Sequence, residues 1–147
     1  MLRPFTEDDG QEFIRVAEES REAWAPWTPA PDPTLDPDER FRRELNRGQL
    51  AARAGTHLRL GAFDGNGQLV GLFALNEIVR GVLEGAYASW QVTAKRMGQG
   101  FGTEGVLVLL SIAFGDGEDA LGLHRVQANV MPANSASLRV AEKVGFR

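Results

Sequence analysis

The chain of 147 residues contains no cysteine, which excludes disulfide bonds, thiolate metal sites and a cysteine nucleophile. It also lacks a run of roughly 20 apolar residues, the length that a membrane-spanning helix needs. The first residues show no basic segment followed by an apolar core, so no signal peptide is predicted. Together these absences predict a cytoplasmic protein that makes no contact with a membrane.

An excess of basic residues is missing too, because 16 lysines and arginines stand against 20 aspartates and glutamates. Nucleic-acid-binding proteins usually have a basic face. Here the run from Arg40 to Arg47 is interleaved with Glu39 and Glu44, which is typical of a solvated helix face. His57 and His124 have no partners at metal-ligand spacing. We therefore expect neither a nucleic-acid partner nor a metal site.

The length, with 43% apolar and 24% charged residues, predicts one soluble domain with one core. Five of the seven prolines lie between positions 26 and 37, which indicates a loop or lid. Apolar periodicity and turn residues predict strands at 2–5, 58–63, 68–79, 85–93 and 124–130, and helices at 7–21, 37–54, 103–115 and 135–144. This order predicts a mixed α/β fold of the α+β class, with a parallel strand pair near the C-terminal end.

Glycines gather between the strand predicted over 85–93 and the helix that follows it, in the turn Met97 to Gly102. Such a turn lets several backbone N–H groups point at one spot, and a helix N-terminus adds a partial positive charge there. The residues thus predict an anion site suited to a phosphate or pyrophosphate. A glycine-rich turn without a ligand is the plainer alternative.

The turn alone does not identify the kind of phosphate ligand. A Walker A loop would end in Lys-Ser or Lys-Thr, and Gly102 is followed by Thr103 and Glu104. The segment Gly100 to Gly105 does match the dinucleotide pattern G-x-G-x-x-G. That pattern also needs an acidic residue at the end of the next strand, and the strand ending at Val130 has none.

Two stretches of the sequence resemble motifs of the GCN5-related N-acetyltransferase (GNAT) family. Trp90 to Gly105 is similar to the family's acetyl-CoA motif. Val130 to Phe146, with its Asn-x-x-Ser and closing Glu-Lys-x-Gly-Phe, is similar to the second motif. The early Trp24-x-x-Trp27 resembles the ribosomal-protein-alanine acetyltransferase branch, the RimJ/RimL type. The resemblance implies a GNAT fold, in which helices flank a mostly antiparallel sheet with a splayed parallel pair.

The resemblance makes residues 1–147 a single acyl-CoA N-acyltransferase domain, with two departures from the family pattern. Met97 stands where the family usually has Gln or Arg. The family also continues with a hairpin of two strands after Gly-Phe, whereas this sequence ends at Arg147. The chain is therefore interpreted as C-terminally truncated, with that hairpin missing.

As an activity, the resemblance implies transfer of an acetyl group from acetyl-CoA to a primary amine, by direct attack in a ternary complex. A protein or peptide N-terminus is one acceptor that fits the branch, and a homodimer is expected from the family. Two alternatives stay open. The first alternative to this activity is a non-catalytic CoA-binding module, and the second is an acetyltransferase of small-molecule amines or antibiotics.

The resemblance also assigns the cofactor site. In this family the strand at 85–93 carries a bulge and splays from the strand at 124–130, and the pantetheine arm fits into the gap. The backbone of residues 98–103 is expected to hold the pyrophosphate. The predicted cofactor-binding residues are Trp90, Gln91, Val92, Met97, Gly98, Gln99, Gly100, Phe101, Gly102, Thr103 and Asn134.

For the chemistry, the Val92 N–H is the expected oxyanion donor. Glu77 and Glu104 are the candidate bases, and Ser137 is the candidate acid because the last helix has no tyrosine. Trp24 and Trp27 are expected to roof the substrate pocket. Each of these residues also has a plainer alternative: a helix cap for Asn134, a solvated or first-turn position for the two glutamates, a surface or packing position for Ser137 and a core position for the tryptophans.

Overall fold

The computed structural model describes residues 1–147, and its five strands form one sheet in the order β1-β2-β3-β4-β5. The strands are β1 (Leu2–Arg3), β2 (Leu58–Phe63), β3 (Leu69–Val79), β4 (Gly85–Val92) and β5 (Arg125–Gln127). The helices are α1 (Gly10–Glu19), α2 (Arg21–Trp24), α3 (Pro37–Arg53), α4 (Phe101–Phe114) and α5 (Ser135–Val144), with 3-10 turns η1 (Glu7–Asp9) and η2 (Ala94–Arg96). This order confirms the predicted mixed α/β fold.

Strands β1 to β4 pair antiparallel, and β4 and β5 pair parallel. The parallel pairing covers only Gly85–Tyr87 against Arg125–Gln127, so the strand predicted over 124–130 is much shorter in the structure. Beyond Tyr87, no strand pairs with the edge of β4 that faces β5. The parallel pair is therefore splayed, as the fold class predicted.

The bulge expected in the strand at 85–93 is in β3 instead. Pairing between β3 and β4 is regular from Gly71↔Val92 to Asn76↔Tyr87, and the register then shifts before Val79↔Gly85. Two residues of β3, Glu77 and Ile78, therefore stand opposite one residue of β4. Glu77 adopts φ 49°, a left-handed conformation that non-glycine residues rarely take.

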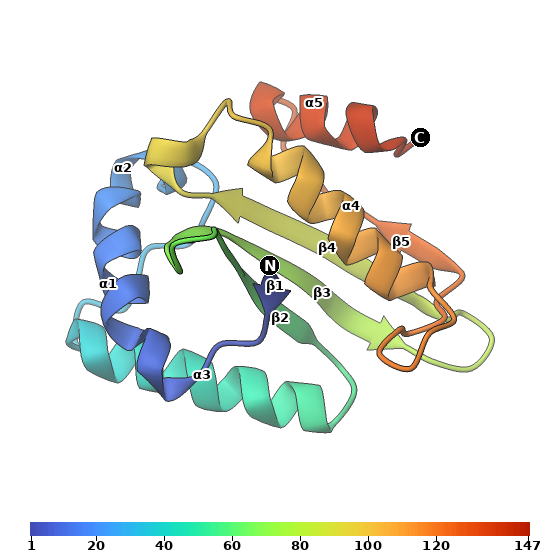
Figure 1. The fold of residues 1–147 in the computed structure, drawn as a ribbon, viewed down its shortest axis with the longest axis horizontal. Helices are drawn as coiled ribbons and strands as arrows, with labels where there is room; N and C mark the ends of the chain where they lie inside the picture. Colours follow the sequence, from blue (N-terminus) through green and yellow to red (C-terminus); the bar gives the residue numbers. More distant parts are fainter.

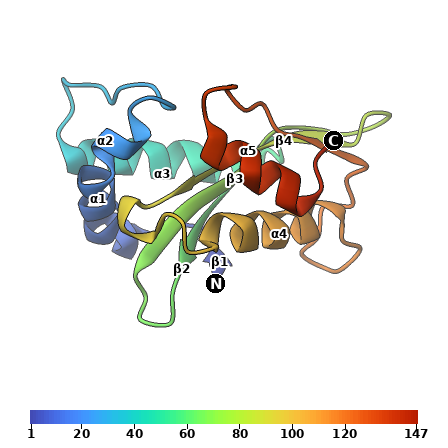
Figure 2. The ribbon, with the colours of Figure 1, turned by 90° about the horizontal axis from the view of Figure 1, so that it is seen from above.

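Helix α4 packs on one face of the sheet, and α1 and α3 lie on the other side (Figures 1 and 2). The main core lies under α4, where Phe73 and Leu75 of the sheet meet Val106 and Leu109 of the helix. A smaller cluster of Val16, Phe63 and Leu69, with the ring of Trp24 against it, lies under α1. The end of β4 is thus held between two packed layers.

The predicted helix over 7–21 is broken in the structure, because it divides into η1, α1 and α2. The break falls at Ser20, which is completely buried. Its hydroxyl accepts a hydrogen bond from the Ala94 N–H at 3.0 Å, just after the end of β4. The chain bends at this point toward the sheet, as Figure 1 shows for α1 and α2.

Candidate functional site

The backbone of β4 has an open edge beyond the point where β5 ends. The Thr93 N–H donates to the Val70 carbonyl at 3.0 Å, which makes this a hydrogen-bonded pair of the antiparallel ladder. Because such pairs alternate along a ladder, the backbone groups of Gln91 also face β3, whereas those of Trp90 and Val92 face the other side. No strand lies on that side at this level. Of the three β4 residues predicted to bind the cofactor, only Trp90 and Val92 offer backbone groups to the gap.

One backbone group on the open edge is already bonded within the protein. The Trp24 indole N–H donates to the Val92 carbonyl at 2.8 Å. The Val92 N–H, on the same edge, has no partner. The Trp90 indole Nε1 is also buried without a hydrogen-bond partner, and its ring lies 6.2 Å from that of Phe146 after α5. Unpaired donors therefore gather where the resemblance places the pantetheine arm.

The glycine turn connects η2 to α4 and leaves its backbone N–H groups free. Gly98 and Gly100 have φ values of 73° and 90°, and Gly100 is the N-cap of α4. The first helical bond runs from Glu104 N–H to the Gly100 carbonyl at 3.0 Å. No hydrogen bond within the protein takes up the N–H groups of residues 98–103. Six donors and the positive end of a helix dipole thus lie together, an arrangement that suits a pyrophosphate.

Gly102 differs from the other two glycines of the turn, because it is buried and lies in the first turn of α4 rather than before it. A Cβ there would lie 3.2 Å from Val140 Cγ2 and 3.4 Å from Val92 Cγ2. Its small size therefore brings α4 close to α5 and to the end of β4. By contrast, nothing lies within 4 Å of a Cβ built on Gly98 or Gly100, so these two leave space for a ligand.

The side chains of the turn show no common orientation toward one spot. Met97 is 46% exposed, and the Gln99 side chain folds back so that Nε2 donates to the Lys95 carbonyl at 2.9 Å. Phe101 is half-buried and packs against the main core. Thr103 is half-buried as well. A ligand at this turn would therefore be held mainly by the backbone.

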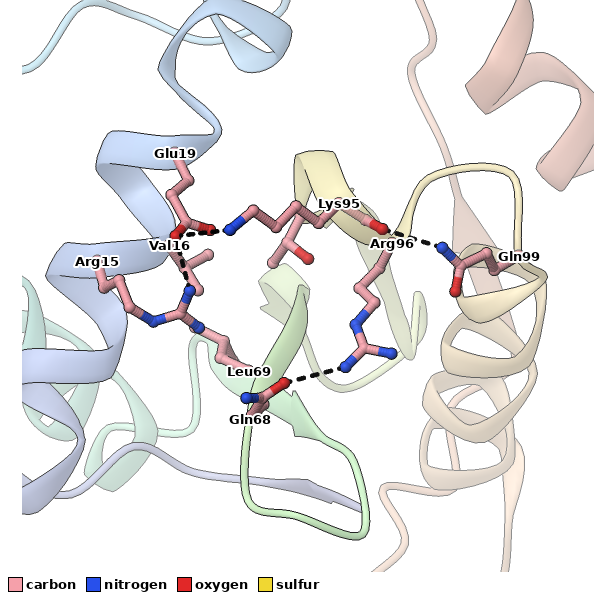
Figure 3. Close-up of a pocket in the computed structure, with 9 residues that line it drawn as sticks. Arg15, Val16, Glu19, Gln68, Leu69, Lys95, Arg96 and Gln99 are labelled. Carbon is pink, nitrogen blue, oxygen red and sulfur yellow. Dashed lines mark hydrogen bonds and ion pairs between the residues drawn. The ribbon is translucent and has the colours of Figure 1, made fainter.

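The 3-10 turn η2 is tied to two other parts of the fold by its two basic side chains; Figure 3 shows the contact of Lys95 with Glu19 and that of Arg96 with Gln68. Arg96 bonds Asp64 at 2.7 Å and Gln68 at 3.1 Å, both in the β2–β3 hairpin. Lys95 pairs with Glu19 of α1 at 3.0 Å. Hydrogen bonds from the backbone of Gln68 and Asn66, together with the nearby Arg96, lower the pKa of Asp64.

A cavity of about 340 Å³ lies between α1, the hairpin and η2, beside these pairs. It is lined by Arg15, Val16, Glu19, Gln68, Leu69, Thr93, Lys95, Arg96 and Gln99. Its three cationic side chains all pair with carboxylates. The cavity therefore offers little free charge to a ligand, and its contacts hold η2 in place.

At the start of α5, Asn134 caps the helix, since its side chain accepts a hydrogen bond from the Ser137 N–H at 3.1 Å. Ser137 is half-buried. It lies one turn before Val140, the residue that meets Gly102, so it is on the face of α5 that turns toward the glycine turn. The cap role of Asn134 is thus present, and Ser137 lies on the side of α5 that faces the start of α4.

The two candidate bases lie away from Val92. Glu77 is exposed at the bulge of β3, six residues along the strand from Gly71, the partner of Val92. At the usual rise per residue that separation is roughly 20 Å. Glu104 is exposed too, and lies two residues after Gly102, which is roughly 200° further around α4. The structure does not bring either carboxylate together with the Val92 N–H.

The two tryptophans of the early motif differ in exposure. Trp24 is half-buried and bonded to Val92, whereas Trp27 is 40% exposed. Ser20, which holds Ala94, was missed by the sequence analysis. Ser20 falls on the same helical stripe as Phe13 and Val16. A serine on this apolar stripe is the feature of the sequence that indicates a buried hydroxyl with a hydrogen-bond partner.

The comparisons with known proteins decide the family. The family model described as "Acetyltransferase (GNAT) domain" matches residues 1–147. The chain belongs to the GNAT acetyltransferase family. It is 29% identical over 146 residues to the probable N-acetyltransferase YjcK of Bacillus subtilis (strain 168), a match that covers 99% of this chain and 78% of that protein.

Solved GNAT structures also match closely in shape. Mycobacterium smegmatis RimJ in complex with CoA-disulfide matches with a TM-score of 0.88 at 26% identity, covering 99% of this chain and 69% of that one. Ribosomal-protein-S5-alanine acetyltransferase from Vibrio fischeri matches with a TM-score of 0.88 at 20% identity, covering 99% and 78%. The likeness to RimJ confirms the RimJ/RimL resemblance seen in the sequence.

As a GNAT domain, the chain is an acetyltransferase that uses acetyl-CoA, and the free donors of the glycine turn and the open edge of β4 fit that co-substrate. No group of three or more histidine, aspartate or glutamate side chains lies together as metal ligands would. None of the helices is long and apolar enough to cross a membrane.

Proposed function

We propose that this GNAT domain acetylates the α-amine of a protein or peptide N-terminus. The observation that carries the acetyl-CoA half of the proposal is the row of free backbone donors that runs from the open edge of β4 into the turn at residues 98–103. The 26% identity to RimJ across 99% of the chain supports a protein acceptor. In the proposal, Trp24, which is bonded to the end of β4, and the exposed Trp27, which follows it by three residues, roof the acceptor site.

In this proposal the N–H groups of residues 98–103 hold the pyrophosphate, and the Trp90 backbone bonds the pantetheine arm. Acetyl-CoA supplies an activated acetyl thioester. The Val92 N–H donates to the thioester carbonyl oxygen, and stabilises the negative charge that develops there when the amine attacks. Asn134 caps α5 and is proposed to contribute a further bond to the cofactor from the start of that helix.

Two protons have to move in the reaction. The amine loses one as it attacks, and the departing thiolate of CoA takes one up. We assign the second proton to Ser137, because it lies on the α5 face that meets the glycine turn. For the first, Glu104 and Glu77 stay candidates, and each would have to act through water from an exposed position.

The cofactor half of the proposal is tested with a charge placed in the glycine turn. Gly100→Asp puts a carboxylate where a pyrophosphate should bind, so acetyl-CoA should no longer raise the melting temperature. Gly55→Asp is the matched control, since Gly55 has φ +70° and nothing within 4 Å of its Cβ. Equal stabilisation of both variants by acetyl-CoA would refute the phosphate assignment.

The acceptor half is tested by CoA release with a panel of N-terminal peptides and small polyamines. The proposal expects thiol release that depends on a free peptide α-amine and is lost when the peptide is N-terminally blocked. Release with polyamines alone would instead favour a small-molecule acetyltransferase.

A further inference from the structure

Two long-range hydrogen bonds attach the junction of α1 and α2 to the end of β4. The Trp24 indole N–H donates to the Val92 carbonyl at 2.8 Å, and the Ser20 hydroxyl accepts from the Ala94 N–H at 3.0 Å. The bonded groups are 68 and 74 residues apart in the chain. Ser20 is completely buried, and the ring of Trp24 packs against the cluster under α1. Both bonds are therefore partly buried.

These bonds hold consecutive peptide groups. The peptide unit between Val92 and Thr93 is bonded on both sides, its carbonyl to Trp24 and its N–H to the Val70 carbonyl at 3.0 Å. The next N–H, that of Ala94, is bonded to Ser20. A peptide plane fixed at both its carbonyl and its N–H has little freedom to rotate. The Val92 N–H belongs to the preceding peptide, whose Gln91 carbonyl faces β3, so it is joined to the fixed plane only through the two backbone torsions of Val92.

The Trp24 bond also defines where the open edge ends. Alternation along β4 places the Trp90 backbone groups, the Val92 N–H and the Val92 carbonyl on that edge. The carbonyl is occupied by the indole, which leaves the Val92 N–H as the last free group before the chain turns into η2. An extended ligand that pairs with this edge cannot bond beyond that N–H.

We propose that Trp24 is a positioning residue for acetyl transfer: its indole N–H fixes the Val92–Thr93 peptide, and this restrains the torsions of Val92 so that the Val92 N–H of the preceding peptide points at the thioester carbonyl. The inference rests on the proposed function, because it takes the Val92 N–H as the oxyanion donor. It goes further in that a side chain from the acceptor side of the domain sets the geometry of that donor. Ser20 supports the same segment from one residue further along.

The decisive variant is Trp24→Phe, which keeps an aromatic ring in the cluster and removes the indole N–H. We expect kcat to fall about tenfold, less than the hundredfold or more that loss of an oxyanion donor costs, because the Val92 N–H is still present but less well directed. The affinity for acetyl-CoA should change less than twofold, since the donors at residues 98–103 are untouched. Ser20→Ala should lower kcat in the same way, by a few-fold.

The matched control is Val16→Ala, which loosens the same apolar cluster without removing a bond to β4. It should lower the melting temperature and leave kcat as it is. If Trp24→Phe does not fold, Ser20→Ala carries the test alone. The inference would be overturned if folded Trp24→Phe kept the wild-type kcat. The same holds for Ser20→Ala when only that variant folds. A rise in the acetyl-CoA Kd that matches the fall in kcat would overturn it as well. A failure of the proposed function looks different, because the wild-type chain would then release no CoA with any peptide.

Discussion

A Cβ on Gly105 would lie 2.1 Å from Cζ of Phe73, in severe overlap with a side chain that is only 2% exposed. Helix α4 therefore approaches β3 at a distance that only glycine allows. The third glycine of the G-x-G-x-x-G pattern thus serves the packing of helix on sheet, whatever ligand binds at the turn before it.

Gly105→Ala should be strongly destabilising for this reason. Core overpacking typically costs about 1–3 kcal/mol, and a contact this short should reach the upper end. For a chain of this size that corresponds to a fall of roughly 10 °C in melting temperature. Gly102→Ala is the comparison, since its Cβ would meet Val140 at 3.2 Å and the loss should be smaller. A larger loss for Gly102→Ala would contradict the packing argument.

The ion pair of Arg3 and Asp9 should give the fold a measurable acid sensitivity. Arg3 bonds both Asp9 carboxylate oxygens, at 2.7 and 2.8 Å, and lowers the Asp9 pKa from 3.8 to about 2. Because the folded pKa is depressed, the stabilisation is complete above the unfolded pKa and is lost as the pH falls toward 2. The difference corresponds to about 2 kcal/mol at neutral pH.

Asp9→Asn should remove that dependence. Urea unfolding between pH 3 and pH 7 should show the variant about 2 kcal/mol less stable at pH 7, with the gap narrowing as the pH approaches 3. A gap that stays constant over this range would mean that packing, not the charge of Asp9, accounts for the difference.

The pair of Arg96 and Asp64 should act on cofactor affinity rather than on turnover, because it ties η2 to the hairpin and leaves the end of β4 untouched. Arg96→Ala should raise the KM for acetyl-CoA about threefold with little change in kcat, a loss of the size expected for one partly exposed ion pair. Asp64→Ala should have a similar effect. The double variant should have a KM for acetyl-CoA no higher than that of either single variant. Strictly additive effects of the two substitutions on KM would show that the two residues act separately.

The left-handed conformation of Glu77 should make this position more stable as glycine. Because a side chain costs about 1 kcal/mol in that region, Glu77→Gly should raise the melting temperature by a few degrees. Glu77→Gln serves as the control and should leave stability unchanged. The same control tests the base, since a loss of activity that is restored at high pH would place the carboxylate in the proton path.

The sequence predicted those elements whose signals are local. The turn Asp64 to Gly67 closes a hairpin, and α5 begins at its Asn134 cap and ends at Gly145 with φ 96°, both as expected. The bulge in β3 was assigned to the wrong strand. Its signal was present, because Leu75 and Ile78 both lie in the main core although alternation would put them on opposite faces.

The attachment of Trp24 to Val92 could not be predicted from residue types. An indole N–H finds its acceptor only once α1 and α2 are packed on the sheet, 68 residues away in the chain. For the same reason, the sequence could name Gln91 beside Trp90 and Val92 but could not tell which backbone groups face the gap. That distinction depends on the register between β3 and β4.

The strand order also has a consequence for how the chain folds. Each antiparallel hairpin closes between residues six apart, Phe63↔Leu69 and Val79↔Gly85, whereas β1 joins its neighbour across 60 residues and β5 across 40. Loop-closure entropy favours the near pairs, so β2, β3 and β4 should form first. Amide hydrogen exchange should accordingly be slowest in β3 and fastest in β1 and β5. The edge of β4 that binds acetyl-CoA would then form before β5 pairs with that edge.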